Sequence, residues 1–154
     1  MKAYLKDPWL YFWIVISELA GVLGAFFTTD GMPWYDALVK PLFTPPGWLF
    51  GPVWTTLYLL MGIAAYIVWK QKNRAAITAF SVQLALNLLW TVLFFGMRLP
   101  GTAFIEIVVL LLAIATTIAL FWKTSRAAGA LLIPYIIWVT FAAVLNYSLW
   151  QLNL

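Results

Sequence analysis

The chain has 154 residues and a formal net charge of +4, and 65% of its residues are hydrophobic while only 9% are charged. Its mean hydropathy of +0.95 lies far above the range of soluble proteins, so the composition indicates an integral membrane protein with no room for a soluble domain. The chain has no Cys and no His, which excludes disulfides, thiolate nucleophiles and the commonest ligands of zinc and haem iron. We therefore expect no metal site and no required cofactor.

Five apolar runs are long enough to cross a bilayer as helices, since each crossing takes about 20 residues. The first run is longer than the core of a signal peptide, and we expect it to be retained as a helix. No alternation typical of membrane strands and no internal repeat is present, which argues against a barrel and an inverted-repeat transporter. We predict an all-α membrane protein, a single bundle of five transmembrane helices. The predicted spans are 9–28, 47–69, 76–95, 101–122 and 128–150.

The predicted first connector, 29–46, is rich in aromatic residues and proline. Residues 34–48 have the sequence WYDALVKPLFTPPGW, in which each proline fixes its own φ and disfavours helix at the residue before it. We predict an ordered lid whose aromatic side chains fold onto the helix ends. Asp36 and Lys40 are four residues apart, a spacing that favours a side-chain pair in a short turn.

The positive charges predict how the bundle crosses the membrane. Seven of the nine cations lie in the N-terminal segment and the second and fourth connectors, whereas only Lys40 and Arg98 lie in the other connectors. Because cationic segments stay inside, we predict an internal N-terminus and an external first connector. The scattered cations give no support to a nucleic-acid partner and instead suit a lipid membrane. The seven are Lys2, Lys6, Lys70, Lys72, Arg74, Lys123 and Arg126.

One face of the third span is unusually polar and aromatic. Gln83, Asn87, Trp90 and Phe94 follow one another at spacings of four, three and four, which places them on one side of a helix. Two amides are costly against lipid, so this face should turn inward. The amides then either line a cavity or simply hydrogen-bond neighbouring helices. The fifth span has a similar face, formed by Trp138, Ala142 and Leu145.

The Trp residues divide into two groups by depth. Those at span ends are typical of interfacial belts. Trp54, Trp90 and Trp138 lie deeper, as does Tyr58, and such rings suit a large flat ligand by offset stacking. Packing within the core is the alternative. The belt group comprises Trp9, Trp13, Trp69, Trp122 and Trp150.

Two acids lie within the apolar runs and need a polar partner, water or a proton. Glu106 falls on the same side of the membrane as Arg98, and a structural pair is the simpler interpretation. Glu18 has no evident partner in the sequence. Small residues spaced by four suggest helix dimerisation, although such pairs are common by chance. These pairs are Ala20 with Gly24, Gly21 with Ala25, and Ala75 with Ala79.

The segments 34–46, 51–62, 83–98 and 133–153 resemble, in order and spacing, the translocator protein (TspO/MBR) family, also called tryptophan-rich sensory proteins or peripheral benzodiazepine receptors, and its bacterial members in particular. The resemblance implies a five-helix bundle, often dimeric, with a porphyrin-binding cavity beneath the first connector. Some members also bind sterols and benzodiazepine-site drugs. Carried over by motif, the cavity residues are Trp54, Asn87, Trp90, Trp138, Ala142 and Leu145, and the lid residues are Trp34 and Tyr35.

Three positions depart from the family pattern. Phe43 replaces a common Trp, which keeps an apolar plug but loses the indole donor. Thr102 stands where mammalian members have a Trp at the drug site, so we expect altered drug affinity. Tyr147 lacks the following cation of the mammalian sterol motif, a weak motif in any case.

The sequence thus favours a membrane receptor or sensor that binds protoporphyrin IX and similar flat ligands. A light-dependent, porphyrin-degrading enzyme is the alternative, and the resemblance then implies that Trp54 and Trp138 participate as catalytic indoles. A passive sterol or tetrapyrrole carrier, or a scaffold, is the third possibility. The predicted ligand-binding residues are Trp34, Tyr35, Trp54, Tyr58, Gln83, Asn87, Trp90, Trp138, Ala142 and Leu145.

Overall fold

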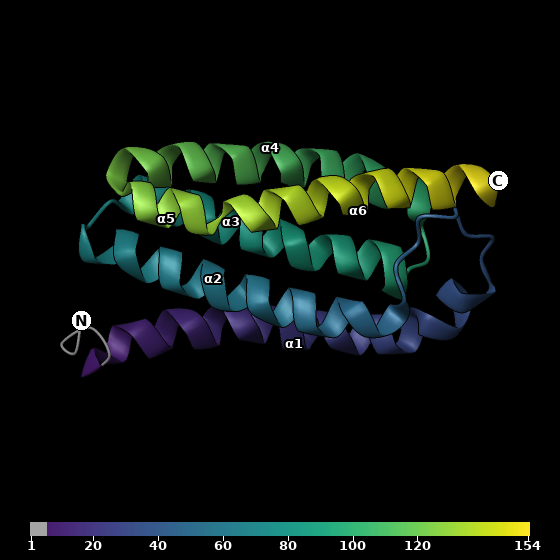
Figure 1. Cartoon of the computed structure of the whole chain (residues 1–154), viewed down its shortest axis with the longest axis horizontal. Helices are drawn as coiled ribbons and strands as arrows, with labels where there is room; N and C mark the ends of the chain where they lie inside the picture. The colour runs from purple at the N-terminus through teal and green to yellow at the C-terminus, as the bar shows by residue number, and fades with distance from the viewer. Residues whose placement is uncertain (1–5) are drawn as a thin grey trace.

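The computed structural model describes residues 6–154, and Lys2 of the cation count lies outside them. It contains five helices long and apolar enough to cross a membrane (Figure 1), which confirms the predicted all-α bundle. η3 continues α3, and α5 with α6 forms the last span. The elements are α1 (Pro8–Ala37), η2 (Gly47–Leu49), α2 (Phe50–Lys70), α3 (Arg74–Thr91), η3 (Val92–Gly96), α4 (Pro100–Thr124), α5 (Arg126–Leu131) and α6 (Ile133–Leu152).

The two ends of the bundle differ in what they bring together. The start of α1 lies at the same end as the connection between α2 and α3, and we call this the N end. The first connector and the end of α6 lie at the opposite end, here the C end (Figure 1). α1 packs against α2, α3 and η3, while α4 packs against α3, η3, α5 and α6. In Figure 1, α1 and α4 form opposite sides of the bundle, with the other helices between them.

α1 is longer than predicted and corrects the bounds of the first connector. The helix continues past residue 28 to Ala37, so the irregular connector is 38–46 rather than 29–46. This extension contains Gly31 and Pro33, two residue types that disfavour helix interiors. Packing overrides that tendency, because Gly31 is buried against Phe95 of η3, where a Cβ would lie 2.5 Å from the Phe95 carbonyl oxygen.

Two of the spans have irregular turns in their course. η3 is a π-helical turn at the end of α3, and it lets the adjacent rings of Phe94 and Phe95 both be buried. π turns of this kind are frequent at functional sites. The last span breaks between α5 and α6, where Pro134 lacks the N–H that a continuous helix would use. Leu132 instead donates its N–H to the Gly129 carbonyl at 3.1 Å.

The first connector is tied to the end of the chain. The Asn153 side chain accepts from Val39 N at 2.9 Å and donates to the Val39 carbonyl at 3.0 Å. Phe43 packs on α6, with its ring centroid 6.2 Å from that of Phe141. Lys40 donates to the carbonyl of Asp36 at 2.8 Å, so it makes a backbone contact instead of the predicted side-chain pair.

Candidate ligand-binding cavity

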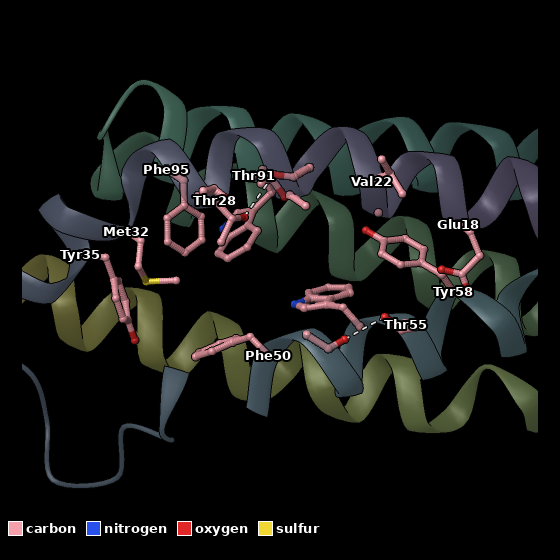
Figure 2. A pocket seen from close by; sticks show the side chains of 17 residues that line it. Glu18, Val22, Thr28, Met32, Tyr35, Phe50, Thr55, Tyr58, Thr91 and Phe95 are labelled. Carbon is pink, nitrogen blue, oxygen red and sulfur yellow. Dashed lines mark hydrogen bonds between the residues drawn. The ribbon is translucent and has the colours of Figure 1, made fainter. Parts of the chain in front are cut away.

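A cavity of about 260 Å³ lies between α1, α2 and the α3–η3 helix. Figure 2 shows Tyr35 and Phe50 towards one end of it and Glu18 and Tyr58 towards the other, with α1 and α2 on opposite sides. Several lining residues, including Val22 and Thr55, are exposed on the outside of the bundle. The cavity therefore opens sideways between α1 and α2.

The α1 wall consists mostly of small residues. Gly21, Gly24 and Ala25 line the cavity, and Ala20 beside them is buried. Their small size leaves the space that the cavity occupies. Ala20 and Gly24 are buried within the chain, so this pair faces the bundle and not a dimer partner. Gly21 and Ala25 are not buried, and the predicted role of this second pair in dimerisation stays a prediction.

The α2 wall carries stacked aromatic rings. Trp54 and Tyr58 have ring centroids 5.5 Å apart and planes 28° apart. Tyr58 donates its hydroxyl hydrogen to Asn87 Oδ1 at 2.5 Å, which fixes its ring. Trp54 is thereby held against a firmly positioned neighbour, one turn closer to the C end.

The third wall comes from α3 and η3 and includes Trp90, Thr91 and Phe95. Trp90 stacks on Phe94 at 5.3 Å and donates its indole N–H to Asn146 Oδ1 of α6 at 3.0 Å. Asn146 in turn donates to the Pro100 carbonyl at 2.8 Å. The Trp90 ring is therefore rigid, and its polar edge points away from any ligand.

Tyr35 and Phe50 close the C end of the cavity. Tyr35 is only 4% exposed, and its ring lies 6.4 Å from Phe50 and 5.7 Å from Phe95. Lys40 of the connector lies over the Tyr35 ring, with Nζ 5.0 Å from the centroid. Trp34, which packs against Phe94 at 5.5 Å, does not line the cavity. Trp34 and Tyr35 both belong to the end of α1. Their predicted placement in the connector, as lid residues, is wrong.

Few polar groups in the cavity are free for a ligand. The hydroxyls of Thr28, Thr55 and Thr91 each bond a carbonyl of their own helix. Among the described residues, the Glu18 carboxyl makes no hydrogen bond or ion pair, and Trp54 Nε1 makes no hydrogen bond. The site thus offers the Glu18 carboxyl as an acceptor and the Trp54 indole N–H as a donor, together with the hydroxyls of Tyr35 and Thr29, in a largely aromatic surface.

The two amides of the predicted third-span face lie behind this wall. Asn87 accepts from Tyr58 and donates to the Tyr135 hydroxyl at 3.0 Å, and that hydroxyl donates to Gln83 Oε1 at 2.8 Å. Both amides are 1% exposed and neither lines the cavity. They connect α2, α3 and α6, as buried polar groups between membrane helices commonly do.

The residues predicted on the fifth span lie beyond Phe50. Trp138 packs against Phe50 at 6.0 Å, and its indole Nε1 is buried without a partner in the described structure. Ala142 and Leu145 line a separate void of about 20 Å³. Of the ten predicted ligand-binding residues, the structure brings four to the larger cavity, namely Tyr35, Trp54, Tyr58 and Trp90.

The cavity and the void are neighbours. Tyr35, Phe50, Trp90 and Phe95 line both. Side-chain movement in this partition would join the two spaces, and movement of Phe50 would also uncover Trp138, on which it packs. Apart from Tyr35, the α1 residues were missed by sequence reasoning, as were Phe50, Thr91 and Phe95, because only depth and side-chain type were available to select candidates.

The predicted pairing of Glu106 with Arg98 is absent. Glu106 is 8% exposed, and neither carboxyl oxygen has a hydrogen-bond partner among the described residues. Arg98 lies in the turn before α4 with φ of 58°, and its side chain is exposed. Within residues 6–154, no cluster of His, Cys, Asp or Glu could hold a metal ion.

Comparison with known proteins gives a consistent result over nearly the whole chain. Residues 13–151 match the model of the TspO/MBR family. The tryptophan-rich protein TspO of Archaeoglobus fulgidus is 44% identical, covering 90% of this chain and 94% of the relative. Protein CrtK of Rhodobacter capsulatus is 40% identical, with 92% and 90% covered. The translocator protein of Bos taurus is 38% identical, with 97% and 94% covered.

Proposed function

The chain belongs to the TspO/MBR family, and on this basis we propose that it is a membrane receptor for porphyrins such as protoporphyrin IX. The observation that carries the proposal is the aromatic cavity, in which the stacked Trp54–Tyr58 pair and Trp90 surround one space. Flat aromatic ligands gain roughly 0.5 to 1.5 kcal/mol per ring pair from offset stacking, beyond the burial of area. A flat macrocycle uses this surface better than a branched lipid does.

The free polar groups also suit a metal-free porphyrin. Its inner N–H groups are donors for the Glu18 carboxyl, and its propionate oxygens are acceptors for Trp54 Nε1. The chain has no His to ligate a porphyrin iron. Glu18, which had no assigned role in the sequence, thus becomes a ligand contact in this proposal.

The partition at Phe50 sets a condition for binding. At about 260 Å³ the cavity is slightly below the roughly 300 to 1,000 Å³ of ordinary ligand pockets, and a tetrapyrrole macrocycle needs more space. The sideways opening accommodates part of the ligand, and displacement of Phe50 would add the small void lined by Ala142 and Leu145 and the space that the Phe50 ring itself fills. We therefore expect Phe50 to move when porphyrin binds.

Light-dependent porphyrin degradation and passive transport are the alternatives to a receptor. Degradation with both Trp54 and Trp138 as participating indoles would need both rings at the ligand, yet Phe50 separates Trp138 from the cavity. The movement of Phe50 that admits the macrocycle would also uncover Trp138, so the illumination experiment described below distinguishes binding from turnover. We also propose that the chain forms a homodimer and has its N-terminus inside. Sterols and benzodiazepine-site drugs would bind with altered affinity, given Thr102 and Tyr147.

A titration with protoporphyrin IX in the dark, followed by Trp fluorescence of the detergent-solubilised protein, tests the proposal. We expect saturable quenching. Trp54→Phe should weaken binding about tenfold, since a lost hydrogen bond to a charged oxygen is worth roughly 1.5 kcal/mol. Trp122→Phe, an exposed Trp outside the cavity, is the matched control and should leave affinity unchanged.

Illumination of the same samples separates the alternatives. An unchanged absorbance spectrum supports a receptor or carrier. Protein-dependent bleaching with a new band, lost in Trp138→Phe, would establish the enzyme instead. Quenching that does not saturate, or that is equally weak in both Trp variants, would overturn the porphyrin site.

A further inference from the structure

A second hollow, of about 700 Å³, lies at the N end of the bundle and shares no lining residue with the aromatic cavity. It is formed by the start of α1, the end of α2, the connecting turn and the first turns of α3. Among residues 6–154, the cations that line it are Lys70, Lys72 and Arg74. We call it the basic groove.

The basic groove has an excess of positive charge. Lys70 is paired with Asp7 at 2.9 Å. Lys72 and Arg74 make no ion pair with any residue in 6–154, and both side chains are exposed. Once Asp7 has neutralised Lys70, two cationic side chains remain without an internal counter-charge.

The backbone between these two cations is firmly held. Asn73 caps α3 by accepting from Ala76 N at 3.1 Å, and its side-chain amide donates to Thr124 Oγ1 at 2.7 Å. Lys72 N donates to the Trp69 carbonyl at 2.9 Å. Lys72 and Arg74 therefore flank a fixed turn, and the positive end of the α3 dipole adds to their field.

The remaining walls of the groove are aromatic and apolar. The rings of Trp9 and Trp69 lie 5.4 Å apart, and Ile77 lies almost one turn further along α3 from Arg74. Trp side chains prefer the level of lipid head groups. The lining thus passes from cations through indoles to an aliphatic side chain. A small free anion would contact only the cations. A phospholipid has a charged head group, a glycerol region and acyl chains, so it can contact all three kinds of side chain.

We propose that the basic groove binds one anionic phospholipid. Lys72 and Arg74 bind the head-group phosphate, the Trp9–Trp69 pair packs on the glycerol region, and Ile77 contacts the first acyl carbons. Basic pockets beside membrane helices are suited to anionic head groups. The assignment does not depend on what occupies the aromatic cavity.

Native mass spectrometry of the detergent-solubilised full chain tests this site. Phosphatidylglycerol, phosphatidylcholine and inorganic phosphate would be added separately, and lipid-bound protein would be measured. We expect one tightly held phosphatidylglycerol and much weaker phosphatidylcholine binding. The double variant Lys72→Asn, Arg74→Gln should weaken phosphatidylglycerol binding about 30-fold, since each cation near the surface contributes about 1 kcal/mol. Asn is chosen because it tolerates the positive φ of 57° at Lys72.

The matched control is Lys123→Gln, Arg126→Gln, which removes the same charge from exposed positions outside the groove. It should keep phosphatidylglycerol affinity within about twofold of wild type, on the same reasoning. Equal loss in both double variants would overturn the site in favour of general surface charge. Equal binding of the two lipids would also overturn it. Displacement of phosphatidylglycerol by an equal concentration of inorganic phosphate would show that the groove takes a free anion and not a lipid.

Discussion

Towards the N end of the bundle the side chains between the helices fill the interior, and the basic groove lies outside it among exposed and half-buried residues. Towards the C end the side chains leave a cavity of about 260 Å³. In the N-end half, Ala64 and Ala65 of α2 are completely buried, and the backbone of α2 packs closely on α5. Phe80 and Phe121 stack there with centroids 6.0 Å apart and no exposed surface. In this half of the bundle, small residues of α2 and large aromatic residues of α3 and α4 are therefore all completely buried.

In the C-end half the helices are spaced by aromatic rings. The last span breaks before Pro134, and beyond this point α2 lies farther from α6. Rings such as Phe50 and Trp138 fill the gap at an interplanar angle of 72°. Phe50 lies between the cavity and the small void, so its ring has room to move without a shift of the backbone. We therefore expect the N-end half, where the helix backbones pack closely, to be rigid. We expect the C-end half, where aromatic side chains separate the helices, to change the shape of its cavity more easily.

The largest effect expected from this comparison is a difference between two Phe residues. Phe80→Ala should destabilise the protein by about 3 kcal/mol, at the low end of the range for a buried Phe. The variant loses packing contacts, but in a membrane the side chain gains little from leaving water, so that part of the usual cost is absent. Phe50→Ala should cost clearly less, since a cavity already lies beside that ring. Thermal unfolding in detergent measures both. Equal losses would mean that the two halves are packed alike.

Two glycines provide a smaller and sharper contrast. A Cβ at Gly62 would lie 2.6 Å from Ile14 Cα, so Gly62→Ala must separate α1 from α2 and should cost about 1 to 3 kcal/mol. A Cβ at Gly21 would lie 2.6 Å from the Tyr58 ring, which is a side chain and not backbone, and the cavity beside this ring gives it room to shift while its hydroxyl stays bonded to Asn87. Gly21→Ala should therefore cost less than about 1 kcal/mol but weaken porphyrin binding. If Gly21→Ala lowers the melting temperature as much as Gly62→Ala, the cavity wall is not adaptable.

The sequence was sufficient for the bundle and for part of the cavity. Hydropathy identified all five spans, and depth selected Trp54, Tyr58 and Trp90, because length and side-chain type are local properties. The role of Gly21 was not predictable, since a small residue can equally serve a dimer, a close helix contact or a cavity wall. The extension of α1 to Ala37 was missed because the contact of Gly31 with Phe95 is tertiary.

The amides of the third span show a different limit. Helical phase correctly placed Gln83 and Asn87 on one face, and both side chains are buried. The positions of these residues around their own helix could not show that the hydroxyls of Tyr58 and Tyr135, from other helices, would hydrogen-bond to the two amides. Gln83 and Asn87 hydrogen-bond to neighbouring helices and do not line the cavity, as the second of the two interpretations proposed.

The smallest expected effect lies at the N end, outside the spans. Asp7 caps α1 by accepting from Trp9 N, and it also accepts from Lys70 Nζ at 2.9 Å and from Tyr66 Oη at 3.0 Å. The hydrogen bond from Lys70, followed by that from Trp9 N, lowers the pKa of Asp7 below its usual 3.8. A carboxyl with a lower pKa in the folded state binds fewer protons there than in the unfolded chain. Its stabilising effect is therefore complete above about pH 3.8 and is lost as the pH falls through the folded-state value.

Asp7→Asn isolates this contribution, because Asn also caps helices. The melting temperature of the variant should be slightly below that of wild type at pH 7, by less than for either change above. The difference should stay constant down to about pH 5 and shrink below about pH 3.8. In a Lys70→Gln background the same substitution should have a smaller effect at pH 7, because the main cause of the shift is gone. No difference at pH 7 would show that Asp7 acts only as a cap, and a difference that persists unchanged at pH 3 would show that the effect of the substitution does not come from the charge of the carboxylate.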